Sequence, residues 1–250
     1  MKKYILFLGL MVALGVQGFA QKVLLEQNVA ADTVKKTFGP NLKYFGHFYG
    51  GFGLIAGAAE AGSEIDHLKS HEFVMGYRYK YKVGKVYALG FDGTVTFQSI
   101  FLEQHPGKIL PNPVLHDQEK YKFTNVGLSF YNRFTWDKRG NYVGNFIDLG
   151  VYGNLMPFKT HIYKDDHLFG IVGPLDGVKE IKVRETGLKY VSDTNYGVLV
   201  RLGFNRYVLY GNYRLSDLFD SGYGVGTVDG GIKVYPELPR LSIGFQIGIH

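Results

Sequence analysis

The stretch from Glu72 to Lys82 reads EFVMGYRYKYK and changes side-chain character at every residue. Phe73, Met75 and three tyrosines occupy its odd positions, whereas three of the even positions are basic. A side-chain period of two is typical of a β-strand with one apolar and one largely polar face. The sequence therefore predicts a two-faced strand here.

The same alternation recurs along the chain. The predicted strands are Tyr44–Ala56, Glu72–Lys82, Tyr87–Gln98, Asn125–Phe134, Val143–Leu155, Asn195–Leu202, Tyr207–Leu215 and Leu241–Ile249. The 34 glycines, 19 tyrosines and 19 phenylalanines favour short strands and turns over helices. An even number of antiparallel strands closes with both ends on one side. We therefore predict an all-β fold, an eight-stranded antiparallel transmembrane β-barrel.

The first residues are typical of an export signal. Lys2 and Lys3 precede an apolar run over Ile5–Val16, and Gly18 and Ala20 supply the small residues of a cleavage site. The run is short for a membrane-spanning helix. We expect cleavage after Ala20, so that residues 1–20 form the signal peptide, residues 21–42 a periplasmic N-terminal segment and residues 43–250 the barrel.

Composition excludes several classes of protein. The chain has no cysteine, so neither a lipoprotein anchor nor a disulfide framework is available. A mean hydropathy of -0.06 is too low for a helical membrane protein. The formal charge is +6, part of it from Lys2 and Lys3, and it is scattered along the strands. This pattern does not favour nucleic-acid binding.

The predicted connections alternate in length. Short turns lie near Gly84, Gly140 and Asn205, whereas long connections cover residues 57–70, 103–120, 157–187 and 216–238. Short periplasmic turns and long extracellular loops are the outer-membrane arrangement, so we predict that location, in contact with outer-membrane lipid. The alternative is a secreted, lipocalin-like barrel with its apolar face inside. Tyrosines near the strand ends and small residues on the polar faces favour the membrane barrel.

Three stretches carry a resemblance to a known family. Phe38-Gly39-Pro40-Asn41 with the following Tyr44, Tyr213-Arg214-Leu215-Ser216-Asp217-Leu218-Phe219, and Tyr235-Pro236-Glu237-Leu238-Pro239 bracket essentially the whole chain after the signal. They resemble the outer-membrane β-barrel proteins of the Bacteroidota, the PorT-like group. The resemblance implies a small outer-membrane barrel and, for one member of the group, a role in a secretion and motility apparatus.

Charged residues also lie on the polar faces, which a closed barrel would bring into one interior. The candidates for an interior charge network are Arg78, Asp92, Arg133, Asp148, Arg201 and Arg214. Buried charges are costly unless they are paired, so we expect ion pairs that plug the lumen. The alternative is a basic pocket that binds a small anion or a lipid.

Histidines stand beside aspartates in the long connections, at Asp66-His67, His116-Asp117 and Asp165-Asp166-His167. If these pairs met at the extracellular rim, they would suit hydrolysis or a divalent metal. No Ser-His or Cys-His constellation accompanies them, and two histidines are a weak metal signal. A rim hydrolase is therefore an alternative to our main prediction of a non-enzymatic protein without cofactor or metal.

The connection over residues 157–187 contains further alternation, which predicts a hairpin that continues two barrel strands beyond the membrane. Its residues are candidates for contact with a protein partner: Lys179, Ile181, Lys182, Val183 and Arg184. An unpaired strand edge can bind an extended segment, and the basic residues would favour an acidic one. We therefore expect a structural or interaction role, in secretion or envelope assembly.

Overall fold

The computed structural model describes residues 36–136, 140, 142–166, 180–220, 224–228 and 231–249. The predicted signal peptide and most of the segment predicted to follow it lie outside these residues. Thr37–His250 form one compact unit that contains all the strands. No helix in the described part of the chain is long and apolar enough to cross a membrane.

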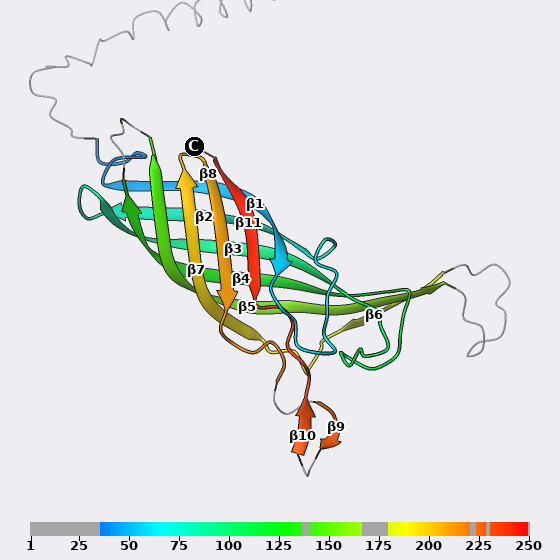
Figure 1. Ribbon diagram of the computed structural model, residues 1–250. Helices are drawn as coiled ribbons and strands as arrows, with labels where there is room; N and C mark the ends of the chain where they lie inside the picture. The colour runs from blue at the N-terminus through cyan, green and yellow to red at the C-terminus, as the bar shows by residue number, and fades with distance from the viewer. Residues whose placement is uncertain are drawn as a thin grey trace, which may run out of the picture. The chain divides into compact units, whose positions relative to one another are not determined.

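Eight antiparallel strands form a closed ring, in which each strand pairs with two others of the ring (Figure 1). The ring closes where β1 pairs with β11, from Phe48 opposite Ile249 to Ala56 opposite Leu241. This confirms the predicted eight-stranded antiparallel barrel. In ring order the strands are β1 (Tyr44–Ala56), β2 (His71–Lys82), β3 (Tyr87–Leu102), β4 (Gln118–Thr135), β5 (Asn145–Asp166), β7 (Thr194–Phe204), β8 (Tyr207–Arg214) and β11 (Leu241–Ile249).

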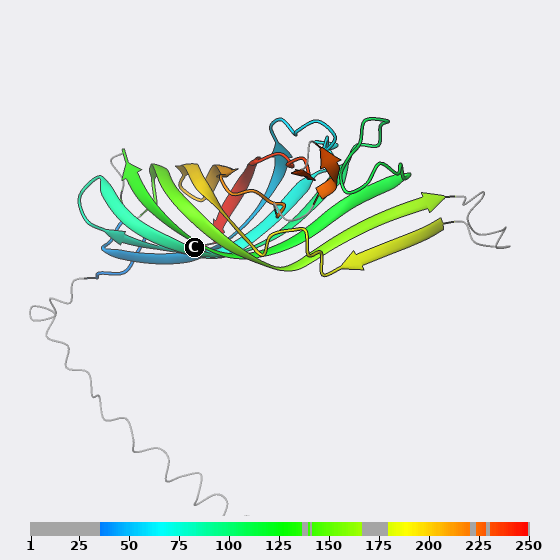
Figure 2. The same cartoon turned by 90° about the horizontal axis from the view of Figure 1, so that it is seen from below.

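Two strands, β3 and β4, run further than the alternation predicted and continue together to the pair Leu102 and Glu119. β5 continues to Asp166, as expected from the hairpin predicted over residues 157–187. Between the pairs Thr124–Phe158 and Val126–Leu155, β5 carries one extra residue and bulges, while β4 continues its alternation without interruption. The additional strand β6 (Glu180–Thr186) pairs back onto the end of β5. Figure 2 shows β5 and β6 extending together beyond the neighbouring strands. A separate two-stranded sheet consists of β9 (Gly224–Val228) and β10 (Gly231–Val234).

Alternation decides which side chains face outward. In β4, Val126, Leu128 and Phe130 are exposed, whereas the intervening Asn125, Ser129 and Arg133 are buried in the lumen. Because the same pattern holds around the ring, an outward apolar belt surrounds a polar interior. On β4 the belt covers Val126–Thr135, and the strand from Gln118 to Thr124 lies beyond it.

The connections at the two ends of the ring differ as predicted. At one end, β7 and β8 are joined by a tight turn in which Asn205 has a φ of 60°. Asparagine tolerates this left-handed conformation better than most residues. The long connections all lie at the other end, which we call the outer end.

Candidate functional site

Arginines and aspartates from neighbouring strands meet inside the barrel. The register places Arg78 of β2 opposite Asp92 of β3, and it places Asp148 of β5 between Arg133 of β4 and Arg201 of β7. Arg78 Nε donates to Asp92 Oδ1 at 3.0 Å. Arg133 donates to Asp148 through Nε at 2.7 Å and Nη2 at 2.8 Å. Arg201 joins the two pairs, because its Nη2 contacts Asp92 and its Nη1 lies 3.8 Å from Asp148.

This luminal network is almost entirely buried, with Arg78 and Arg133 each 1% exposed. Neutral groups take part in it: Arg78 Nη2 donates to Gln246 Oε1 at 2.8 Å, and Ser129 Oγ donates to Asp92 Oδ2 at 3.1 Å. The Arg133 guanidinium also lies 3.5 Å from the centroid of the Phe146 ring. The network therefore fills this level of the lumen with paired charge and aromatic rings.

Arg214 lies outside this network, although the sequence grouped it with the other arginines. It stands at the end of β8, where its Nη1 donates to Glu237 Oε2 at 2.9 Å. Glu237 also accepts from the backbone N–H groups of Leu218 and Phe219, at 2.8 and 3.1 Å. Its carbonyl oxygen accepts from Ser63 Oγ at 2.7 Å. Sequence analysis missed Glu237 as a functional group, although it lies within the quoted Tyr235–Pro239 motif.

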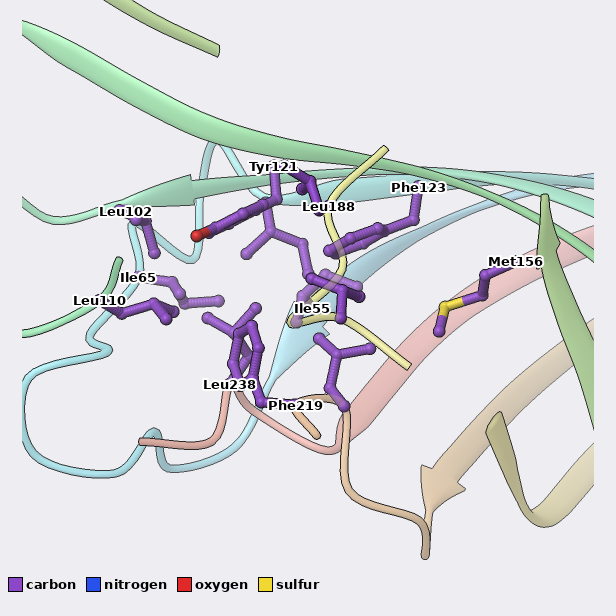
Figure 3. Packing of buried hydrophobic residues seen from close by; sticks show 13 residues of the cluster. Ile55, Ile65, Leu102, Leu110, Tyr121, Phe123, Met156, Leu188, Phe219 and Leu238 are labelled. Carbon is purple, nitrogen blue, oxygen red and sulfur yellow. The ribbon is translucent and has the colours of Figure 1, made fainter. Parts of the chain in front are cut away.

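An apolar cluster lies at the outer end of the barrel, where the sequence predicted long connections. Leu110 comes from the β3–β4 connection, Phe219 and Leu238 from the two ends of the β8–β11 connection, and all three pack together with Tyr121 of β4 and Ile55 of β1. Figure 3 shows these side chains converging from separate segments of the chain. The long connections therefore fold over the outer mouth, and we call this cluster the apolar cap.

The Asp-His pairs are only partly brought together. His116 Nδ1 lies 2.9 Å from Asp165 Oδ2, so this contact joins the connection before β4 to the end of β5. His67 Nδ1 instead lies 3.0 Å from the carbonyl oxygen of Ile55, and His167 lies outside the described residues. Over the described ranges, no three His, Asp or Glu side chains are grouped to hold a metal ion. The contacts that these groups make join segments of the outer end.

A polar cluster that sequence analysis missed lies at the base of the β5–β6 hairpin. Glu119 of β4 accepts from Lys108 Nζ and from Gln104 Nε2, the latter at 3.0 Å. His161 of β5 lies 2.7 Å from Glu119 through Nε2 and 3.2 Å from Glu185 of β6 through Nδ1. Three strands and one connection are therefore joined at a single buried point. The sequence signal for this cluster is the alternation that β4 continues from Glu119 to Thr124, outside the predicted strand.

Glu64, in the β1–β2 connection at the outer end, has a partly exposed carboxylate. Glu64 Oε2 lies 2.9 Å from His105 Nε2 and accepts from the Gly62 N–H at 2.8 Å. Partial burial would raise the pKa of Glu64, but hydrogen bonds from backbone N–H groups and His105 outweigh it and lower that pKa. These contacts join the β1–β2 connection to the β3–β4 connection.

The candidate interaction hairpin consists of β6, the end of β5 and the connection between them. β6 is the last strand of its sheet, so one of its two edges has no partner strand among the described residues. Lys182 and Arg184 are exposed, and Ile181 and Val183 are half-buried. Lys179 lies outside the described residues.

These features define a small closed β-barrel with a polar, filled lumen and an apolar exterior. No protein-family model matches the sequence, and no curated protein matches it either. Among solved structures, the chain is similar to the attachment invasion locus protein Ail of Yersinia pestis, alone and in complex with the heparin analogue sucrose octasulfate. In both comparisons the sequence identity is 12% and the TM-score is 0.28. The aligned region covers 81% of this chain and 93% or 94% of the Ail chain. A likeness of this size does not bear on family or function.

Proposed function

We propose that the protein is a non-enzymatic outer-membrane β-barrel that binds a partner protein through the open edge of β6. The apolar belt supports the membrane placement. Phe130 is 62% exposed and Leu155 is 62% exposed, although both lie in the middle of long strands. Large apolar side chains at such positions are costly in water but suit lipid, and a closed ring leaves no unpaired backbone in the membrane.

The open edge of β6 is the observation that carries the interaction role. Edge strands present unpaired N–H and C=O groups, which an extended segment of another protein can pair with. Inside the belt, the closed ring offers no such edge. In the described part of the outer end, β6 supplies one beyond the belt, held rigidly by the contacts of His161 with Glu119 and Glu185.

The charges of the hairpin favour an acidic partner segment. Lys182 and Arg184 project from β6, and Lys189 follows it along the chain, all three of them exposed. Complementary charge mainly raises the association rate and is screened by salt. Partner binding should therefore weaken as ionic strength rises. A role of this edge in secretion or envelope assembly belongs to the same proposal.

A hairpin deletion tests this function. Ile162 pairs directly with Arg184, so an Asn-Gly turn can replace residues 163–183 while His161 keeps its contact with Glu119. The matched control places the same turn in the other outer hairpin, replacing residues 224–234 of β9 and β10. Both variants should remain heat-modifiable on gels, but only the first should lose partners that crosslink to the wild-type protein in outer membranes. Retention of those partners by the first variant would contradict the proposal.

A small luminal chamber supports a second candidate function, the binding of a small anion. The chamber has a volume of about 90 Å³ and is lined by residues that include Glu72, Asn125, Arg201 and Arg214. Arg201 Nε is buried there without a hydrogen-bond partner among the described residues, and its N–H is free to donate to an anion. Inorganic phosphate should raise the unfolding temperature of the wild-type barrel but not that of Arg201→Gln. If phosphate changed the unfolding temperature of both proteins equally, the chamber would not be an anion site.

A further inference from the structure

Beyond the belt, the extension of β4, β5 and β6 has two faces. Partners across antiparallel strands share a face, and so do residues two apart. The register pairs Lys120 with Ile162, Ile162 with Arg184, and Lys164 with Lys182. These residues therefore share one face. The opposite face carries Tyr121, Phe123 and His161, which pack in or beside the apolar cap. The shared face is thus the outer one, and its cations are Lys120, Lys122, Lys164, Lys182 and Arg184.

Most of this positive charge has no counterion in the protein. Lys164 Nζ pairs with Glu180 at 2.8 Å, and Asp166 lies opposite Glu180 on the same face. Over the described residues, no ion pair involves Lys120, Lys122, Lys182 or Arg184. Burial and the positive charges of Lys122, Lys182 and Lys164 lower the pKa of Lys120, which lies beyond the belt on β4. The cations are therefore close enough to repel one another.

Aromatic rings connect this face with the apolar belt. Lys120 Nζ lies 4.5 Å from the ring centroid of Phe101, its cross-strand partner on β3. The Phe101 ring contacts His71, and His71 stacks on Phe52. On β5, Phe158 is 68% exposed and precedes Ile162 on the same face. Aromatic side chains gather where the hydrocarbon of a membrane meets its headgroups. The cations therefore begin at the level of the headgroups.

We propose that this outer face, formed by Lys120, Lys122, Lys164, Lys182 and Arg184, binds phosphate groups of lipid headgroups in the surrounding leaflet. The inference rests on the membrane placement in the proposed function but not on the partner protein. Lipid is favoured over an acidic protein segment for the face as a whole, because Lys120 and Lys122 lie on β4, away from the open edge of β6, and continue directly from the apolar belt. Lys182 and Arg184 also flank that edge, where a segment paired with β6 would meet them. Basic clusters beside a membrane attract anionic headgroups, and an arginine can bind a phosphate through two N–H groups. The open edge of β6 remains available to a protein.

The test compares lipid retention by three forms of the full mature barrel. One variant replaces all five outer-face cations with glutamine. A control variant removes the same number of exposed cations elsewhere: Lys43, Lys69, Lys85, Lys189 and Arg206. Each protein is folded in detergent and titrated with diphosphorylated lipid A or with its dephosphorylated form. Native mass spectrometry then measures the fraction of protein that carries lipid.

The wild-type and control proteins should bind the phosphorylated lipid with similar affinity, at least about tenfold more tightly than the five-glutamine variant. The preference for the phosphorylated lipid should disappear in that variant. Equal binding by all three proteins, or equal binding of the two lipids by the wild type, would overturn the proposal. So would binding of an added acidic peptide to this face by a protein that binds neither lipid. Insertion into phosphatidylcholine vesicles is scored separately by heat-modifiable mobility, so a failure of the membrane placement itself is distinguished from a failure of phosphate binding.

Discussion

Arg133 and Asp148 face each other across the β4–β5 pair and join through two parallel hydrogen bonds, at 2.7 and 2.8 Å. The planar guanidinium and the carboxylate fix each other's orientation, which a single contact does not achieve. Both side chains are almost fully buried. The pair therefore joins the luminal faces of two neighbouring strands, and removing either partner would leave an isolated charge inside.

Reversing Asp148 to arginine should destabilise the barrel strongly. Asp148→Arg would place three arginines side by side across β4, β5 and β7, without a carboxylate between them. We expect a loss of about 3–5 kcal/mol in the free energy of unfolding, as for breaking a buried ion pair. The free energy of unfolding is measured by urea titration, with the folded fraction read from the heat-modifiable mobility on gels. Glu103→Arg makes the same change at an exposed site and should have little effect. A comparable loss in both variants would argue against the network as its cause.

Two strand glycines should respond in opposite ways to alanine. A Cβ on Gly203 would lie 2.0 Å from the Phe146 ring, and that ring is fixed against the Arg133 guanidinium. Gly203→Ala should therefore cost about 1–3 kcal/mol through overpacking. Gly153 faces outward with open space around it, so Gly153→Ala should change stability little. Equal unfolding midpoints of the two variants would show that the lumen adapts more easily than its contacts indicate.

The wild-type barrel should not conduct ions. Eight strands enclose a lumen that side chains can fill. Here the luminal network occupies it, and the apolar cap covers the outer mouth. Planar-bilayer recordings should show no steady single-channel steps. Flotation with vesicles of the same lipid checks that the protein has inserted, so that an absence of current is not caused by failed insertion. A stable conductance in inserted protein would contradict a closed lumen.

Acidification should loosen the contact between the β1–β2 and β3–β4 connections. The pKa of Glu64 in the folded protein lies below its ordinary value of 4.5, so its ionised form is the stabilising one. Its contribution is fully present above that ordinary value and is lost as the pH falls through the lower folded pKa. Hydrogen-exchange protection around Gly62, corrected for intrinsic rates, should decrease over this range. Glu64→Gln should lack the transition, and a transition that persists in it belongs to another group.

The barrel could be predicted from the sequence because each strand of the ring has an apolar outward face and a polar face in the lumen. Alternation such as that of Phe73, Met75 and Tyr77 follows directly from that division. The pairing of Arg133 with Asp148 and Arg201 depends on strand register, which alternation alone leaves open. The sequence supplied the candidate residues, and the register shows which of them meet.

The outer end was harder to predict because its contacts join distant connections. Leu110, Phe219 and Leu238 show no alternation of their own and pack only after the ring has placed their connections together. Glu237 similarly meets Arg214 and Ser63 from other parts of the chain. The outer face of the extension combines Lys120 and Lys122 with residues more than forty positions away. Its pattern is visible only in the structure, where β4 and β5 remain paired beyond the bulge on β5.

The direct pairing of β1 with β11 makes the order of strands cyclic, so the ring itself has no first strand. Phe48 and Ile249 are opposite each other at the end where the short turns lie. A linker that joins the two strands there, with new ends opened at the turn between Asn205 and Arg206, would leave every strand pair of the barrel unchanged. Circular permutation should therefore alter the sequence in which the strands are synthesised while preserving the architecture that they form.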